Sequence, residues 1–139
     1  MIRSYFNFMN KDKKYPGCSK IIKKTTGSEY YVGAINDDFI LEDGSHFHHH
    51  QMISFGALFK YVKSGGYYIL EDITEEGIDA CCQRNDETYK VIFNLKETGK
   101  IENEHLLEEE IKYIENNIKQ IDIYPDIKNN YRVAIIHKK

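Results

Sequence analysis

The fold of this chain is decided by residues 39–72, which read FILEDGSHFHHHQMISFGALFKYVKSGGYYILED. The apolar run Phe39-Ile40-Leu41 predicts a short buried strand that leads into a loop at Asp43-Gly44-Ser45. From about residue 49 to 63 the apolar period becomes helical, because four large side chains recur at spacings of three and four: Phe55, Leu58, Phe59 and Val62. A strand followed by a helix is therefore expected.

A second buried strand is expected directly after this helix. Ser64-Gly65-Gly66 ends the helix, since glycine readily adopts the left-handed conformation that follows a helix. Residues 67–70 form the next apolar run, and it ends in Glu71-Asp72. The order strand, helix, strand within about 35 residues predicts a parallel βαβ unit.

The remainder of the chain predicts one further helix and a closing pair of strands. Residues 74–87 are polar and predict an irregular segment, whereas the pattern of residues 89–93 fits either a helix or a strand. An amphipathic stripe predicts a helix from His105 to Gln120. Residues 121–124 and 131–136 predict two antiparallel strands on either side of a turn.

Composition places the chain among soluble globular proteins. Its 139 residues suit one domain, and 41% hydrophobic with 29% charged residues argues against disorder. No apolar run approaches the ~18 residues that a membrane helix needs, and the first residues lack the apolar stretch of a signal peptide. The three cysteines, two of them adjacent, make a poor disulfide framework, so we expect a cytoplasmic protein.

Residues 1–36 form a basic N-terminal segment, which we separate from a domain at residues 37–139. The first 24 residues hold seven Lys or Arg and one acidic residue, and aromatic residues lie between them. Short strands are expected near residues 20–24 and 30–32. Such an arm could contact nucleic acid, but a solvated tail or a contact with an acidic partner is the more common role, so no nucleic-acid partner is expected.

Acidic residues follow both strands of the βαβ unit, and they form the candidate site. Asp43 follows the first strand and Glu71-Asp72 follow the second. Because adjacent parallel strands lie ~4.8 Å apart, these carboxylates are expected to meet at one edge and to need a cation. Oxygen ligands favour Mg²⁺, with Mn²⁺ or Ca²⁺ as alternatives. His46, in the same loop as Asp43, is suited to accept a proton from a hydroxyl group. The other interpretation is that these carboxylates are turn and helix-capping residues.

The same residues resemble the metal-dependent sugar O-methyltransferases of macrolide biosynthesis. The resemblance rests on residues 42–46, on His50-Gln51, on the glycine turn and on residues 68–72: EDGSH, HQ, KSGG and YILED. It implies a Rossmann-like α/β fold, S-adenosylmethionine as methyl donor, Mg²⁺ on Asp43, Glu71 and Asp72, and His46 as general base on a sugar or glycan hydroxyl. Glu42 departs from the family pattern, which has Asp there.

The resemblance covers only the C-terminal half of such a fold. No glycine-rich donor-binding loop precedes residue 37. We therefore expect a partial Rossmann-like methyltransferase sheet, an α/β fold that lacks the donor-binding half. The 39–41 strand would then be an exposed edge that residues 1–36, a second copy or a separately encoded N-terminal half covers.

Two functions follow from these expectations. One is a truncated or partner-dependent O-methyltransferase, and the other is a non-catalytic methyltransferase-like remnant that serves as a binding or assembly module. His46 and His48-His49-His50 also permit a zinc interpretation, because histidines at i and i+4 of a helix can share a metal. The family pattern already accounts for His46 and His50.

Overall fold

The computed structural model describes residues 21–23, 29–31, 38–43, 47–74, 86–125 and 131–139. Strands β1 (Ile21–Lys23) and β2 (Glu29–Tyr31) pair antiparallel within the N-terminal segment. The main body contains β3 (Phe39–Glu42), α1 (His48–Leu58), a 3₁₀ turn η1 (Phe59–Tyr61) and β4 (Tyr67–Thr74). It continues with α2 (Asp86–Thr98), α3 (Glu108–Asn117), β5 (Ile118–Pro125) and β6 (Tyr131–Lys138).

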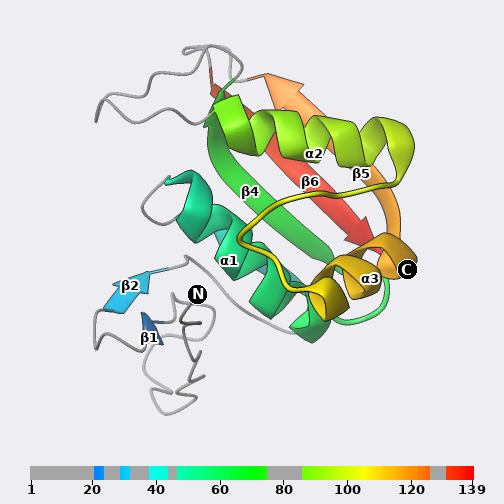
Figure 1. The fold of residues 1–139 in the computed structure, drawn as a ribbon, viewed down its shortest axis with the longest axis horizontal. Coiled ribbons are helices and arrows are strands. Elements are labelled where there is room, and N and C mark those ends of the chain that lie inside the picture. The colour runs from blue at the N-terminus through cyan, green and yellow to red at the C-terminus, as the bar shows by residue number, and fades with distance from the viewer. Residues whose placement is uncertain (1–20, 24–28, 32–37, 44–46, 75–85, 126–130) are drawn as a thin grey trace.

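The four long strands form one mixed sheet in the order β3-β4-β6-β5. The β3–β4 pair is parallel, with Phe39 opposite Tyr67 and Glu42 opposite Leu70, so the expected parallel βαβ unit is confirmed. The β4–β6 and β5–β6 pairs are antiparallel. The predicted antiparallel closing strands are thus also present, and β6 inserts between β4 and β5 (Figure 1).

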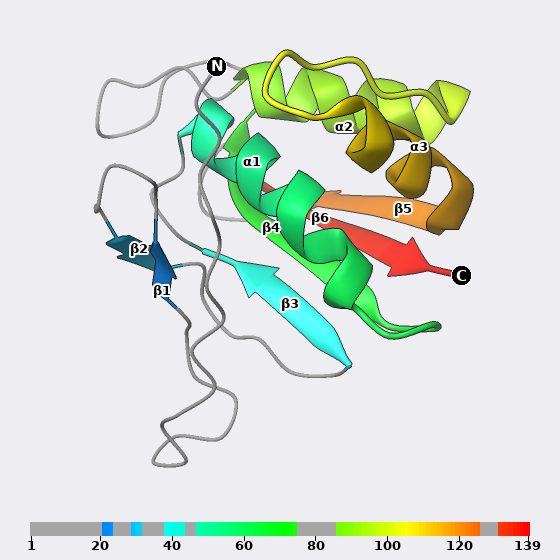
Figure 2. The ribbon, with the colours of Figure 1, turned by 60° about the horizontal axis from the view of Figure 1, so that its bottom comes forward.

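The helices of the described residues all lie on one face of this sheet (Figure 2). The core fills the space between them and the sheet. It includes Phe55, Leu58, Phe59 and Val62, the stripe that predicted the first helix, and each of these is at most 1% exposed. The described part of the chain is a two-layer α/β arrangement, whereas a doubly wound sheet has helices on both faces.

The predicted helix over residues 49–63 is shorter in the structure. Helix α1 ends at Leu58, a 3₁₀ turn follows, and Gly65 has a φ of +79° in the connection to β4. Lys138 stabilises this end of the helix from the last strand. Its ammonium group donates to the carbonyl oxygens of Lys60, at 3.1 Å, and Val62, so that main-chain acceptors left over at the helix end are satisfied.

Two other sequence boundaries are corrected. The predicted helix from His105 to Gln120 begins at Glu108 and ends at Asn117, because residues 118–120 already belong to β5, in which Ile118 and Gln120 pair with β6. Residues 89–93, which fitted either element, lie within α2. Of the segment predicted to be irregular, residues 75–85 lie outside the described residues, Thr74 is in β4, and Asp86 and Glu87 begin α2.

None of the helices in the described residues has the length and apolar character needed to cross a membrane.

Candidate functional site

The parallel pairing of β3 with β4 brings Asp43 to the level of Glu71. Glu42, the last residue of β3, is opposite Leu70, so the next residues along the two strands lie at the same edge of the sheet. Glu42 is fully buried, whereas Asp43 is exposed. The alternation of a strand explains this difference, because successive side chains point to opposite faces. Asp43 and Glu71, which the sequence singled out, therefore follow paired residues of two adjacent strands.

Strand β4 does not end at Glu71-Asp72, as the sequence predicted, but continues to Thr74. Leu70 is opposite Ala134 and Ile73 is opposite Arg132, so two residues of β4 face one residue of β6. This is a β-bulge. Asp72 within it has a φ of +53°, a left-handed conformation that Asp tolerates better than most residues. Glu71 and Asp72 thus lie in a local irregularity of a longer strand.

A buried side chain of α1 contacts this bulge. The amide Nε2 of Gln51 donates to the main-chain oxygen of Glu71 over 3.2 Å. Gln51 is fully buried, and within the described residues its Oε1 has no hydrogen-bond donor. In the sequence, Gln51 belongs only to the His50-Gln51 pair that contributes to the resemblance. A polar amide at a position that the helical period places on the buried face, next to Met52 and Phe55, was the signal that could have marked it.

The proposed general base, His46, lies outside the described residues, as do Gly44 and Ser45. The structure therefore gives no position for the histidine relative to Asp43, Glu71 and Asp72. The histidines at the start of α1 are described, and their surroundings differ from what the sequence suggested.

His48 joins three segments of the chain. Its Nδ1 lies 2.8 Å from the hydroxyl of Thr88 in α2, and its Nε2 lies 2.9 Å from the amide nitrogen of Asn103 in the connection to α3. Because the side-chain nitrogen of Asn103 can only donate, Nε2 of His48 accepts and its Nδ1 carries the proton. Burial lowers the pKa of His48, and the nearby Glu87 partly opposes this effect. Thr88 and Asn103 carried no sequence signal, since their role depends on contacts over 40 and 55 residues.

The rings of the other histidines at this corner contact one another in tilted and edge-on arrangements. The rings of His49 and His50 have centroids 4.2 Å apart, and His105 lies 5.6 Å from His48 and 6.0 Å from His49. His105 reaches this corner from the connection between α2 and α3. Its main-chain N–H donates to the Asn103 side chain over 3.0 Å.

The metal interpretations can be compared with this geometry. In the described ranges no three residues among His, Cys, Asp and Glu are arranged to hold a metal ion. The zinc interpretation rested on His46 with His50, and His46 lies outside the described residues, so the structure gives no geometry for this pair. Asp43, Glu71 and Asp72, all of them described, do not form a ready-made three-carboxylate Mg²⁺ site in these side-chain positions.

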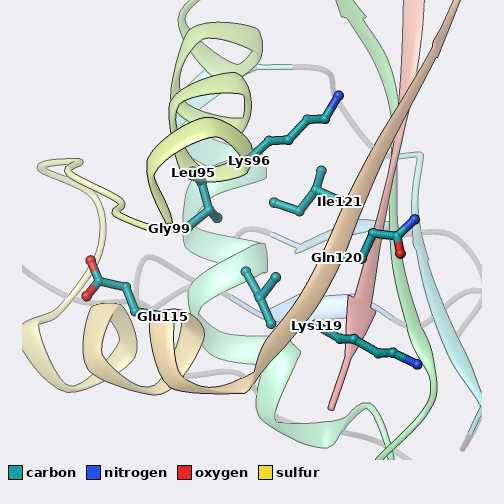
Figure 3. A pocket seen from close by; sticks show the side chains of 8 residues that line it. Leu95, Lys96, Gly99, Glu115, Lys119, Gln120 and Ile121 are labelled. Carbon is teal, nitrogen blue, oxygen red and sulfur yellow. The ribbon is translucent and has the colours of Figure 1, made fainter.

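A small hollow of about 160 Å³ lies elsewhere, between the ends of α2 and α3 and the start of β5. Figure 3 shows Leu95 and Ile121 at its apolar part, with Lys96 and Lys119 extending away from each other. Ile121 is opposite Ile136, which is opposite Tyr68 near the start of β4. The hollow therefore lies toward the end of the sheet that is opposite to Glu71-Asp72. None of the predicted site residues line it.

Comparison with known proteins gives a short local match. The chain is 47% identical over 36 residues to demethylmacrocin O-methyltransferase of Streptomyces fradiae and, to the same extent, to mycinamicin VI 2''-O-methyltransferase of Micromonospora griseorubida. It is 43% identical over 35 residues to L-olivosyl-oleandolide 3-O-methyltransferase of Streptomyces antibioticus. Each of these matches covers about a quarter of this chain and 9% of the relative.

No family model matches the sequence, and no solved structure matches it. The matched part is a small fraction of each relative, so the likeness is local. The short match supports a methyltransferase-like relationship, and S-adenosylmethionine is the donor that such a relationship implies.

Proposed function

We propose that this chain forms the acceptor-side part of an S-adenosylmethionine-dependent O-methyltransferase that acts on a sugar or glycan hydroxyl. The observation that carries the proposal is the match of 47% identity over 36 residues to O-methyltransferases. The parallel β3-α1-β4 unit supports it, because ligands of open α/β sheets gather beyond the carboxyl ends of parallel strands. Asp43 and Glu71-Asp72 directly follow Glu42 and Leu70, the last residues that pair in the parallel β3–β4 ladder.

Methyl transfer to a hydroxyl group requires that its proton leave as the new C–O bond forms. We assign this proton to His46, whose ordinary pKa lies near neutrality. Asp43, Glu71 and Asp72 are the residues that we propose to hold Mg²⁺ next to the acceptor. Since they do not form a three-ligand group in the described structure, we assign no chemical step to the ion.

We propose that the methyl donor is bound by residues outside the described sheet. The sequence of residues 1–36 lacks the glycine-rich pattern that is typical of donor-binding loops. We propose that a second copy or a separately encoded N-terminal half supplies the donor site, and that it docks along β3. This strand is the outermost one next to β4 in the described sheet. Such a strand readily takes another chain as its neighbour.

Isothermal titration with Mg²⁺ and with S-adenosylmethionine tests the proposal. We expect the isolated chain to bind Mg²⁺ and not the donor. Asp43→Asn and Asp72→Asn should each weaken Mg²⁺ binding at least about tenfold, roughly 1.4 kcal/mol, because each removes a charged ligand. Asp122→Asn is the matched control, since this carboxylate lies on β5 and pairs with His137 over 2.8 Å. A wild-type chain that binds neither ligand would refute the catalytic proposal.

The second candidate is a non-catalytic remnant that serves as a binding or assembly module. One observation favours it, namely that the described carboxylates present no three-ligand group. Under this alternative, Asp43→Asn and Asp72→Asn change no binding property of the chain. The same titrations therefore separate the two candidates.

A further inference from the structure

The β-bulge at Glu71-Asp72 is joined to α1 by a buried side chain. In regular pairing every buried main-chain carbonyl accepts a hydrogen bond from the neighbouring strand. At the bulge, two residues of β4 face one residue of β6, so regular pairing is interrupted between Leu70 and Ile73. Within this interrupted stretch, the main-chain oxygen of Glu71 accepts a hydrogen bond from the Gln51 side chain of α1.

The hydrogen bond fixes the orientation of the Gln51 amide. A carbonyl oxygen only accepts, so Nε2 must face Glu71, and Oε1 then points elsewhere within the core. Oε1 is buried and has no donor among the described residues. A buried acceptor of this kind costs stability, which an apolar residue at position 51 would avoid. The presence of Gln51 therefore calls for a reason other than packing.

From this geometry we infer that Gln51 is a positioning residue that holds the Glu71-Asp72 bulge at the candidate site. It acts through the main chain of Glu71. It thereby links α1, the helix that follows the Asp43 loop, to the Glu71-Asp72 bulge of β4. The inference rests on the proposed function in one respect, namely that Asp43 and Glu71-Asp72 form the acceptor site. The bulge also keeps Asp72 in its left-handed conformation, which sets the direction of its carboxylate.

Gln51→Leu removes the buried acceptor Oε1, which has no donor among the described residues, and it also removes the hydrogen bond to the Glu71 oxygen, so the two effects oppose each other. We therefore expect thermal stability close to that of the wild type, with a local loosening of the bulge. Met52→Ala is the matched control, because Met52 is the next residue of α1 and is also fully buried. It leaves a cavity and lowers overall stability without removing the hydrogen bond to Glu71.

Amide hydrogen exchange of the full chain, read at single residues by NMR, tests the inference. In Gln51→Leu, exchange at residues 71–73 should rise about tenfold or more, while the amides in the middle of β6 stay at wild-type rates. In Met52→Ala, any rise should be spread over α1 and the sheet. The inference would be overturned if residues 71–73 of Gln51→Leu exchanged at wild-type rates. It would also be overturned if the faster exchange in this variant were spread over the sheet.

Gln51→Glu gives a second readout that a purely structural role would not produce. A buried carboxylic acid has a raised pKa, and its protonated form can still donate to the Glu71 oxygen. Relative to the wild type at each pH, exchange at residues 71–73 should be normal at low pH and faster once the acid ionises. A pH-independent ratio would overturn the inference. These measurements need no ligand, so their outcome is separate from that of the Mg²⁺ and donor titrations.

Discussion

His48 and Asn103 are hydrogen bonded, with 2.9 Å between Nε2 and the amide nitrogen, although 55 positions separate them in the sequence. With the bond from His48 to Thr88, this contact ties the start of α1 to α2 and to the connection before α3. Both bonds need a neutral imidazole whose Nε2 accepts. The corner therefore depends on the protonation state of one half-buried ring.

Stability should fall as pH decreases through the range where His48 titrates. Burial lowers its pKa in the folded chain, so the unfolded chain takes up the proton first, near pH 6.5. The contribution of neutral His48 is present above pH 6.5 and is lost as pH falls toward the lower, folded pKa. Thermal unfolding from pH 5 to pH 8 measures the loss.

His48→Gln is the control for this pH dependence. It does not titrate, so the difference in unfolding temperature between pH 8 and pH 5 should be smaller in the variant. Glu87, Glu104, His49 and His105 also act on His48, and they remain in both proteins. An identical pH dependence in the two proteins would show that His48 does not contribute it.

The left-handed conformation of Asp72 predicts an order of stability among its variants. Asp72→Gly and Asp72→Asn should be at least nearly as stable as the wild type, because both residues adopt a positive φ readily. Asp72→Val should lose about 1–2 kcal/mol, since its branched side chain strains this conformation. Urea unfolding measures the order, and a Val variant as stable as the Gly variant would contradict it.

Gly56 allows α1 to approach the start of α3. A methyl group added there would lie 2.5 Å from the Glu110 carboxylate and 2.6 Å from Leu106. Gly56→Ala should therefore destabilise the fold by about 1–3 kcal/mol through overpacking, which outweighs the gain in helix propensity of roughly 0.5–1 kcal/mol.

A double-mutant cycle checks this close approach by urea unfolding. Glu110→Ala shortens the side chain that a methyl group at position 56 would meet. The double variant should therefore lose less stability than the sum of the two single losses. Additive losses would mean that Glu110 is not what limits the space at Gly56.

Lys138 should stabilise the junction between the last strand and the end of η1. Its side chain is almost fully buried, and its ammonium group also lies over the rings of Phe59 and Tyr113, at 5.6 and 5.1 Å from their centroids. Lys138→Met keeps the apolar stem but leaves buried carbonyl oxygens without donors, so we expect a loss of about 2–4 kcal/mol.

Lys139→Met is the matched control for the lysine junction. Lys139 is exposed, and its ammonium group donates to the Asn116 carbonyl over 2.9 Å at the surface. This variant should lose less than about 0.5 kcal/mol. Equal unfolding midpoints for the Lys138 and Lys139 variants would show that the buried contacts contribute nothing.

The candidate site was only partly predictable. The position of Asp43 at the level of Glu71 follows from the parallel pairing of β3 with β4, which the short βαβ spacing already predicted. The bulge at Glu71-Asp72 was not predictable, because an apolar run that meets two acidic residues has the pattern of a strand that ends there. The partners Gln51, Thr88 and Asn103 emerge only when segments far apart in the sequence meet.

The sequence by itself determined the β3-α1-β4 unit, because apolar periods of two and 3.6 and a glycine turn are local properties of the chain. It also determined that two antiparallel strands close the fold. Only the tertiary structure decided that helix α3 ends at Asn117, that β6 lies between β4 and β5, and that β4 continues past Asp72. A strand is completed by hydrogen bonds to a distant neighbour, so its boundaries depend on which segment pairs with it.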